Sequence, residues 1–256
     1  MIRVEHDGEG IATVTIDNLA ARNAMTFAMW DALRDHARAL DADPSVRVVV
    51  ITGAGGAAFV SGTAITEFRG FTADDGAAYE RRMDAVMEAL EAIRVPVIAA
   101  IAGACTGGGV AIASTCDLRI GEPAVRIGVP IARTLGNCLS IANLARVADL
   151  VGVPAAKALL FSARLLDAQA ALHAGLLNEV VLDVDALLPR AHEIARGMLA
   201  LAPLTLRATK EGFRRLRAAR ALPAGSDLIR ACYGSDDFRE GVTAFLEKRA
   251  PRWSGT

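Results

Sequence analysis

Short apolar runs rich in β-branched residues alternate, up to about residue 183, with longer segments in which apolar residues recur at helical spacing. This alternation predicts an α/β fold with crossover connections between its strands. The expected strands are 2–6, 12–16, 46–51, 97–102, 118–120 and 179–182. The first two are expected to form a hairpin around Gly8–Gly10.

Helix start signals precede two of the amphipathic segments. Thr26 is the expected N-cap of a helix that runs to about Leu40. Thr72, with Asp75 three residues later, is typical of a capping box at the start of a long helix. Beyond about residue 183 the strand signal disappears, and helices are expected over 184–202, 204–221 and 227–248. The sequence predicts one domain, 1–256, with an α/β core over 1–190 and a helical region over 191–256.

Composition supports a packed globule. Of 256 residues, 53% are hydrophobic and 22% are charged, which favours a buried core over disorder. The formal net charge is −1 without a long run of one sign, so no nucleic acid or anionic membrane is expected as a partner.

The N-terminus lacks the apolar core of a signal peptide, which indicates a cytoplasmic protein. The four cysteines form no CxxC pair and are expected to be reduced thiols.

One uncharged stretch, Val95–Cys116, is long enough to cross a bilayer. Pro96 and several glycines divide it into two short pieces. A buried strand followed by a buried helix is therefore the preferred interpretation.

Glycine turns carry the main chemical signal. Gly53–Ala58 matches the dinucleotide-binding pattern GxGxxA, but another turn follows where a Rossmann unit needs a helix, so a loop is preferred. Two other turns, Ser61–Ile65 and Gly103–Gly109, each follow a predicted strand. If parallel strands place these turns side by side, their N–H groups can converge on one oxygen, each stabilising a transition state by about 3–4 kcal/mol. The alternative is that the glycines only permit close packing of helix on strand.

Five segments match a set of motifs in a fixed order: Arg22–Met25, Phe59–Ile65, Ala102–Asp117, Ser162–Val181 and Phe245–Gly255. The third contains three successive glycines and ends in Cys-Asp, and the fifth reads FLEKRAPRWSG. Together they resemble the enoyl-CoA hydratase/isomerase (crotonase) superfamily over nearly the whole chain.

This resemblance implies an α/β, crotonase-like (ClpP/crotonase) spiral of ββα units, with residues 191–256 as a helical trimerisation region. It implies a homo-trimer or a dimer of trimers that binds acyl-CoA thioesters. Coenzyme A would be part of the substrate, and neither a metal nor another cofactor is expected.

Site residues follow from the same resemblance. The oxyanion donors would be the main-chain N–H groups of Thr63 and Gly108. The residues expected to contact coenzyme A are Arg22, Ser61, Ala64, Ile65, Phe245 and Lys248. In the family the last two are often supplied by a neighbouring subunit.

Two positions depart from the family's hydratases, which use a pair of glutamates. Ala111 and Ile131 stand there, and neither can move a proton, although each acid–base group is commonly worth ~10²–10⁴-fold in rate. Arg133 is the expected replacement, because a guanidinium can hold a carboxylate or an enolate oxygen. A salt bridge or a phosphate contact is the alternative for Arg133. Asn137 is expected to orient water or a substrate group, or else to cap a helix over 136–147.

Three functions remain open. The favoured one is an acyl-CoA lyase that stabilises a thioester enolate, for example by decarboxylating a malonyl-type thioester, because loss of CO₂ forms the enolate without a base. The second is hydration or isomerisation of an enoyl thioester by another carboxylate, with Glu67 and Glu80 as candidates. The third is an acyl-CoA-binding protein without catalysis.

Overall fold

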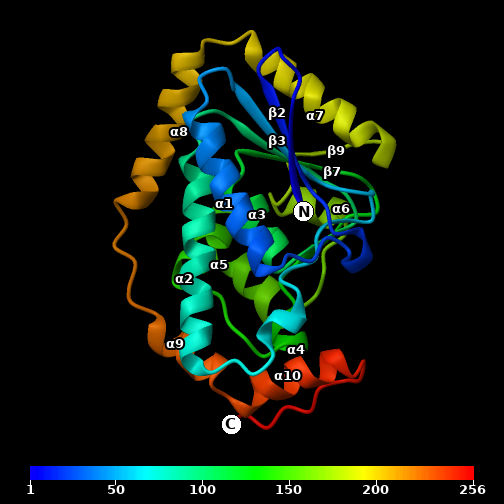
Figure 1. Cartoon of the computed structure of the whole chain (residues 1–256), viewed down its shortest axis with the longest axis vertical. Coiled ribbons are helices and arrows are strands. Elements are labelled where there is room, and N and C mark those ends of the chain that lie inside the picture. Colours follow the sequence, from blue (N-terminus) through cyan, green and yellow to red (C-terminus); the bar gives the residue numbers. More distant parts are fainter.

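The computed structural model describes residues 1–256 as two sheets surrounded by helices (Figure 1). The larger sheet has six strands in the order β1-β2-β3-β5-β7-β9, and the smaller has three in the order β4-β6-β8. Only β1 and β2 pair in the antiparallel sense, while every other pair is parallel. The strands are β1 (Ile2–His6), β2 (Ile11–Ile16), β3 (Val48–Gly53), β4 (Ala58–Val60), β5 (Val97–Ile101), β6 (Ala104–Thr106), β7 (Leu118–Gly121), β8 (Arg126–Gly128) and β9 (Glu179–Val180).

Ten α-helices and two short 3₁₀ helices complete the chain. The 3₁₀ helices are η1 (Leu19–Ala21) and η2 (Ile65–Phe68). The α-helices are α1 (Phe27–Ala42), α2 (Ala73–Ala92), α3 (Gly108–Thr115), α4 (Ile131–Thr134), α5 (Ile141–Ser162), α6 (Ala168–His173), α7 (Val184–Leu199), α8 (Pro203–Ala218), α9 (Ser226–Tyr233) and α10 (Asp236–Leu246). None of these helices has both the length and the apolar character that crossing a membrane requires.

A repeated unit gives the fold its form. Strands β3, β5 and β7 of the larger sheet are each followed by a short strand of the smaller sheet, β4, β6 or β8, and then by a helix. Each successive unit therefore adds one parallel strand to each of the two sheets. The predicted spiral of ββα units is confirmed.

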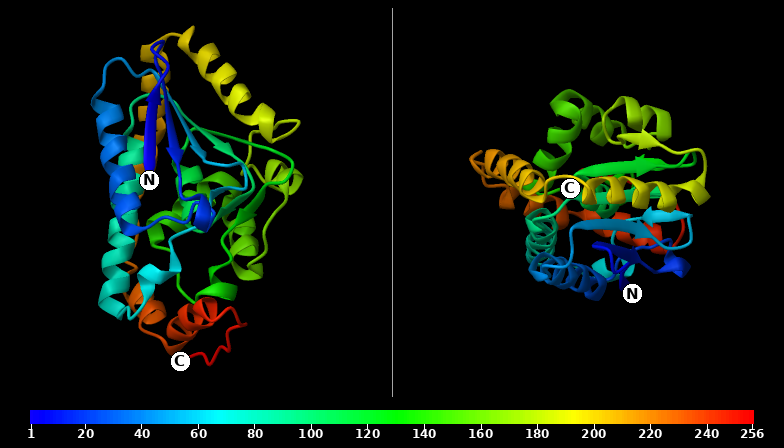
Figure 2. Two further views of the ribbon diagram at one scale, coloured as in Figure 1. Left: turned by 45° about the vertical axis from the view of Figure 1, so that its right-hand side comes forward. Right: turned by 90° about the horizontal axis from the view of Figure 1, so that it is seen from above.

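Helices cover both faces of the larger sheet. Along β3, Val48 and Val50 pack in one cluster with Leu187 of α7, while Val49 and Ile51 belong to the main core with α1, α2 and α3. This alternation follows from the period of two in a strand. Figure 2 shows α7 across one face of the sheet, and Figure 1 places the C-terminal helices α9 and α10 at the far end of the molecule from it.

The six predicted strands and the hairpin are all present, with ends shifted by no more than two residues. Both predicted caps are also confirmed. The Thr26 side chain accepts from the amide of Met29, and Thr72 with Asp75 forms a complete capping box. The strands of the smaller sheet were not predicted, because three residues each are too few to show a period.

Two predicted helices have the wrong bounds. The helix expected over 136–147 begins only at Ile141, because Gly136 has a φ of +73° and Ser140 caps α5 through the amide of Asn143. The helix expected over 227–248 is divided into α9 and α10, since Ser235 caps a new helix there.

Candidate active site

The two glycine turns lie side by side. Ser61–Ile65 follows β4. The predicted turn Gly103–Gly109 contains the short strand β6, and its last three residues, Gly107–Gly109, follow that strand. Because β4 and β6 pair in parallel, Ser61–Ile65 and Gly107–Gly109 leave the smaller sheet at the same end of its strands. The Thr106 hydroxyl donates a hydrogen bond to the carbonyl of Ser61 at 3.0 Å. A Cβ atom built on Gly108 would lie 3.8 Å from the Cα of Gly62.

The main-chain amides of Thr63 and Gly108 donate no hydrogen bond to another group of the chain. Gly108 is the first residue of α3, where an amide has no partner within its own helix. On the other turn, Met25 donates to the carbonyl of Gly62 and accepts from the amide of Ala64, which leaves the N–H of Thr63 unused. Two adjacent turns thus each present one free donor.

Close packing needs glycine at two neighbouring positions. A Cβ atom on Gly103, whose φ is +56°, would lie 2.0 Å from the carbonyl oxygen of Ala57. A Cβ atom on Gly109 would lie 2.3 Å from that of Val60. Gly103 and Gly109 therefore bring β6 and α3 against β4, and this contact sets the distance between the two turns.

Thr63 and Gly108 both border a cavity of about 940 Å³. Every residue predicted for the site lines this cavity except Arg133 and the alternative carboxylate Glu67. The lining includes Arg22, Ser61, Thr63, Ala64, Ile65, Gly108, Ala111, Ile131, Asn137, Phe245 and Lys248. Phe245 of α10 and the adjacent Lys248 come from the same chain as the glycine turns, so one subunit brings all of these residues together.

Arg133 departs from the sequence prediction. It is exposed and does not line the cavity, whereas Ile131, Thr134 and Leu135 do. Residues three and four apart share a helix face, and Arg133, two positions after Ile131, falls on the other side of α4. The structure gives no support for the expected contact between Arg133 and a substrate carboxylate.

The two alternative carboxylates lie in different places. Glu67 of η2 accepts from the amide of Phe27 at 3.4 Å and does not line the cavity. Glu80 does line it, together with Met83 and Met87 at helical spacing on the same face of α2. Only 3% of Glu80 is exposed.

Glu80 has hydrogen-bond donors on both carboxylate oxygens. The Tyr233 hydroxyl donates to Oε1 at 2.7 Å, and the amide of Ser140 donates to Oε2 at 3.1 Å. Burial, together with the nearby charge of Asp84, nevertheless raises the pKa of Glu80 to about 7 against the opposing effect of the two hydrogen bonds. The carboxyl group can therefore gain or lose a proton near neutral pH.

Replacement of Glu80 by glutamine is expected to change how stability depends on pH. Between the ordinary carboxyl pKa of 4.5 and about 7, the folded protein keeps the Glu80 proton while the unfolded chain releases it. The wild-type free energy of unfolding therefore loses about 3 kcal/mol from this group as pH rises through that window. Urea unfolding of both proteins should show the stability of Glu80→Gln relative to wild type rising with pH. Parallel curves would contradict the shifted pKa.

Asn137, Cys138 and Ser140 lie in the segment between α4 and α5, and Asn137 lines the cavity. Asn137 donates through Nδ2 to the Tyr233 hydroxyl at 3.1 Å, and its Oδ1 is buried without a partner. Ser140, not Asn137, caps the following helix. Burial raises the pKa of the Cys138 thiol, and the neighbouring Cys232 raises it further, so Cys138 is a neutral thiol and a poor nucleophile.

Trp30 and Tyr79 are site residues that the sequence analysis did not identify. Trp30 donates through Nε1 to the Thr63 hydroxyl at 3.0 Å, and the Tyr79 hydroxyl lies 2.7 Å from the same atom. Together they hold the turn that carries the Thr63 amide. Neither could be identified from the sequence, because nothing local indicates a polar partner far along the chain.

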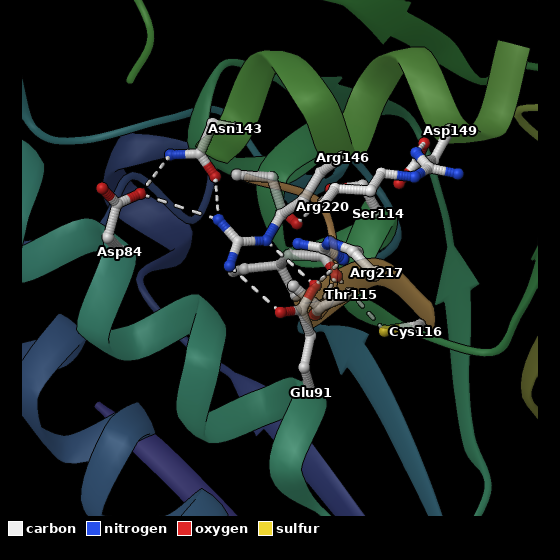
Figure 3. Close-up of polar contacts among 12 residues, drawn as sticks. Asp84, Glu91, Ser114, Thr115, Cys116, Asn143, Arg146, Asp149, Arg217 and Arg220 are labelled. Atoms are coloured by element: carbon white, nitrogen blue, oxygen red, sulfur yellow. Dashed lines mark hydrogen bonds and ion pairs between the residues drawn. The ribbon is translucent and has the colours of Figure 1, made fainter. Parts of the chain in front are cut away.

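A partly buried ionic network around the buried Arg146 joins α2, α5 and α8 (Figure 3). Arg146 forms two hydrogen bonds with Glu91, at 2.9 and 3.0 Å, and donates to Oδ1 of Asn143 at 3.0 Å. Glu91 also pairs with Arg217 of α8. Asn143 lines the cavity, so this network supports the wall of the candidate site.

The chain matches the model of the family described as enoyl-CoA hydratase/isomerase over residues 6–256. It is 34% identical over 245 residues to the crotonyl-CoA hydratase of Syntrophomonas wolfei, covering 94% of this chain and 93% of that protein. It is 33% identical over 249 residues to the short-chain-enoyl-CoA hydratase of Clostridium acetobutylicum, covering 96% and 94% of the two chains.

Solved structures show the same fold. A protein from Magnetospirillum magneticum described as an enoyl-CoA hydratase/carnithine racemase superposes with a TM-score of 0.81 and 33% identity, covering 100% of this chain and 96% of that one. A methylmalonyl-CoA decarboxylase in complex with 2-nitronate-propionyl-CoA superposes with a TM-score of 0.89 and 26% identity, covering 100% and 98%. The chain belongs to the enoyl-CoA hydratase/isomerase family, whose enzymes act on acyl-CoA thioesters.

Proposed function

We propose that the protein is an acyl-CoA lyase that forms a thioester enolate between the amides of Thr63 and Gly108, with decarboxylation of a malonyl-type thioester as its reaction. The observation that carries this proposal is the pair of free amides on adjacent turns at one cavity. Ala111 and Ile131, where the family resemblance expects glutamates, line the same cavity. An apolar wall disfavours a bound carboxylate relative to neutral CO₂.

In this reaction the bond between Cα and the carboxylate carbon breaks and CO₂ leaves. The electron pair stays on Cα and is delocalised onto the thioester oxygen, which faces the two amides. Each such donor is commonly worth about 3–4 kcal/mol of transition-state stabilisation. Protonation of Cα then completes the product. The similarity of the fold to a methylmalonyl-CoA decarboxylase supports the proposal.

Coenzyme A is proposed to enter from the side of the cavity where Arg22, Phe245 and Lys248 lie. Arg22 and Lys248 would pair with its phosphate groups, and Phe245, which is 54% exposed, offers an aromatic face for the nucleotide. Ser61, Ala64 and Ile65 would contact the remainder of the carrier. These contacts position the thioester and take no part in the chemical step.

A panel of thioesters tests the reaction. Malonyl-CoA and methylmalonyl-CoA are expected to release CO₂, and crotonyl-CoA is expected to keep its conjugated absorbance, because Ala111 and Ile131 cannot activate water. Loss of that absorbance without CO₂ release would overturn the proposal in favour of hydration. Tight binding of all three without turnover would favour an acyl-CoA-binding protein.

Hydration or isomerisation of an enoyl thioester is the second candidate. The specific observation in its favour is that Glu80 lines the cavity. The names of the relatives, crotonyl-CoA hydratase and short-chain-enoyl-CoA hydratase, point the same way.

Assembly as a trimer or a dimer of trimers is also part of the proposal. Helix α8 buries none of its residues within the chain, and it exposes Leu204, Phe213 and Leu216 by 75%, 71% and 67%. Phe213 and Leu216, three positions apart, share one face of the helix, and exposed apolar side chains that lie together are typical of a subunit contact. Light scattering of the purified protein would give the number of subunits.

A further inference from the structure

We infer that Glu80 is the catalytic residue that moves the proton at the α-carbon of the bound thioester, an inference that rests on the enolate chemistry proposed above. Glu80 lines the cavity that contains Thr63 and Gly108. The preceding residue, Tyr79, contacts the Thr63 hydroxyl at 2.7 Å, so α2 is tied directly to the turn that carries one of the free amides. The usual glutamate positions of the family resemblance play no part in this assignment.

The hydrogen bonds of Glu80 leave its proton free for a ligand. Both partners of the carboxylate, the Tyr233 hydroxyl and the amide of Ser140, are donors. These two donors orient the carboxylate oxygens. When Glu80 is protonated and neutral, neither the Ser140 amide nor the donating Tyr233 hydroxyl accepts a hydrogen bond from its proton. The proton of Glu80 is therefore available to a ligand bound in the cavity.

Each proton transfer balances. As a base, the Glu80 carboxylate takes a proton from Cα, the C–H electron pair forms the enolate, and the charge moves to the thioester oxygen beside the amides of Thr63 and Gly108. In the reverse direction the Glu80 carboxylic acid protonates Cα. After decarboxylation the same acid protonates the enolate left by CO₂, and Glu80 regains a proton from water.

The groups that face Glu80 set the pH at which it works. Asp84 lies one turn away on α2 and raises its pKa, while the Tyr233 hydroxyl from α9 lowers it. Tyr79 and Cys138 are also close enough to interact with its charge, and burial raises the pKa of both, so they stay neutral near pH 7. No lysine or arginine pairs with Glu80. The carboxyl group of Glu80 therefore changes between its protonated and its ionised form near neutral pH.

Exchange of α-protons with solvent tests the inference without knowledge of the full reaction. Propionyl-CoA is incubated with the enzyme in D₂O, and deuterium at Cα is followed by mass spectrometry. The wild type is expected to exchange, and Glu80→Gln is expected to exchange at least ~100-fold more slowly while propionyl-CoA still binds. Glu88→Gln is the matched control, because Glu88 is exposed on the same helix, and it should exchange like the wild type. Equal rates for Glu80→Gln and the wild type would overturn the inference.

Tyr233→Phe provides a second variant with a distinct readout. Phenylalanine keeps the buried ring but removes the hydroxyl that donates to Glu80, and loss of this donor raises the pKa of the carboxyl group. The pH profile of exchange should shift to higher pH, since more base is then needed to ionise Glu80. A lower rate with an unchanged profile would show that Tyr233 acts only through packing and would count against the inference.

The decarboxylation assay separates this inference from the proposed function. If the wild type releases CO₂ and Glu80→Gln does so equally fast with normal exchange, the inference fails while the function stands. If no malonyl-type thioester loses CO₂ but exchange depends on Glu80, the inference stands and decarboxylation fails. If the wild type neither exchanges nor decarboxylates, both are overturned.

Discussion

Gly109→Ala should lose at least about 100-fold in kcat/KM, because a shift of about 1 Å in catalytic geometry costs that much. The added Cβ would lie 2.3 Å from the carbonyl oxygen of Val60, an atom of the backbone that cannot turn aside. Helix α3 must move away from β4, and this movement separates the amides of Gly108 and Thr63. Overpacking of this kind also costs about 1–3 kcal/mol of stability.

The measurements are turnover on the thioester that the wild type uses and thermal unfolding of both proteins. Gly197→Ala is the matched control, because Gly197 is an exposed glycine within α7 with no atom near its built Cβ. This change should raise stability by about 0.5–1 kcal/mol and leave turnover unaltered. Normal turnover in Gly109→Ala would show that the spacing of the two turns does not control the reaction.

Arg146→Met is expected to lower the free energy of unfolding by about 3–5 kcal/mol, the usual result of removing one partner from a buried ion pair. The Arg146 side chain is only 2% exposed, and it bonds Glu91 through two nitrogen atoms (Figure 3). Without it, Glu91 keeps only Arg217, and Oδ1 of Asn143 loses its donor. Urea unfolding near neutral pH measures the loss.

The double variant Arg146→Met/Glu91→Leu should recover part of that stability, because no carboxylate is then left facing an apolar side chain. Arg217 also loses Glu91 in this variant, but its side chain is 28% exposed and can be hydrated. Arg215→Met is the control on the surface. Its ion pair with Glu211 is 76% exposed at the arginine side chain, and exposed pairs of this kind are worth about 0–1 kcal/mol. A loss for Arg146→Met no larger than that of the control would mean that water screens the network.

Some residues of the candidate site could be predicted from local sequence patterns and others could not. The two glycine turns could be identified because glycines after strands are a local signal, and parallel pairing of β4 and β6 brings the turns together. The choice of Thr63 and Gly108 within these turns came from the family resemblance. Arg133 could not be placed, since one residue of difference in the start of a four-residue helix turns each side chain by about 100° around the helix axis. Glu80 was one of two carboxylates between which the sequence had no means to choose.

The sequence by itself determined the α/β class, the six strands of the larger sheet, the caps at Thr26 and Thr72 and the family resemblance. These depend on periods of two and 3.6 residues and on hydrogen bonds that span only a few positions. Tertiary structure alone decided the three-residue strands and the contact of Tyr233 with Glu80, 153 positions apart. Such contacts arise from how elements pack, and no pattern within either element encodes its distant partner.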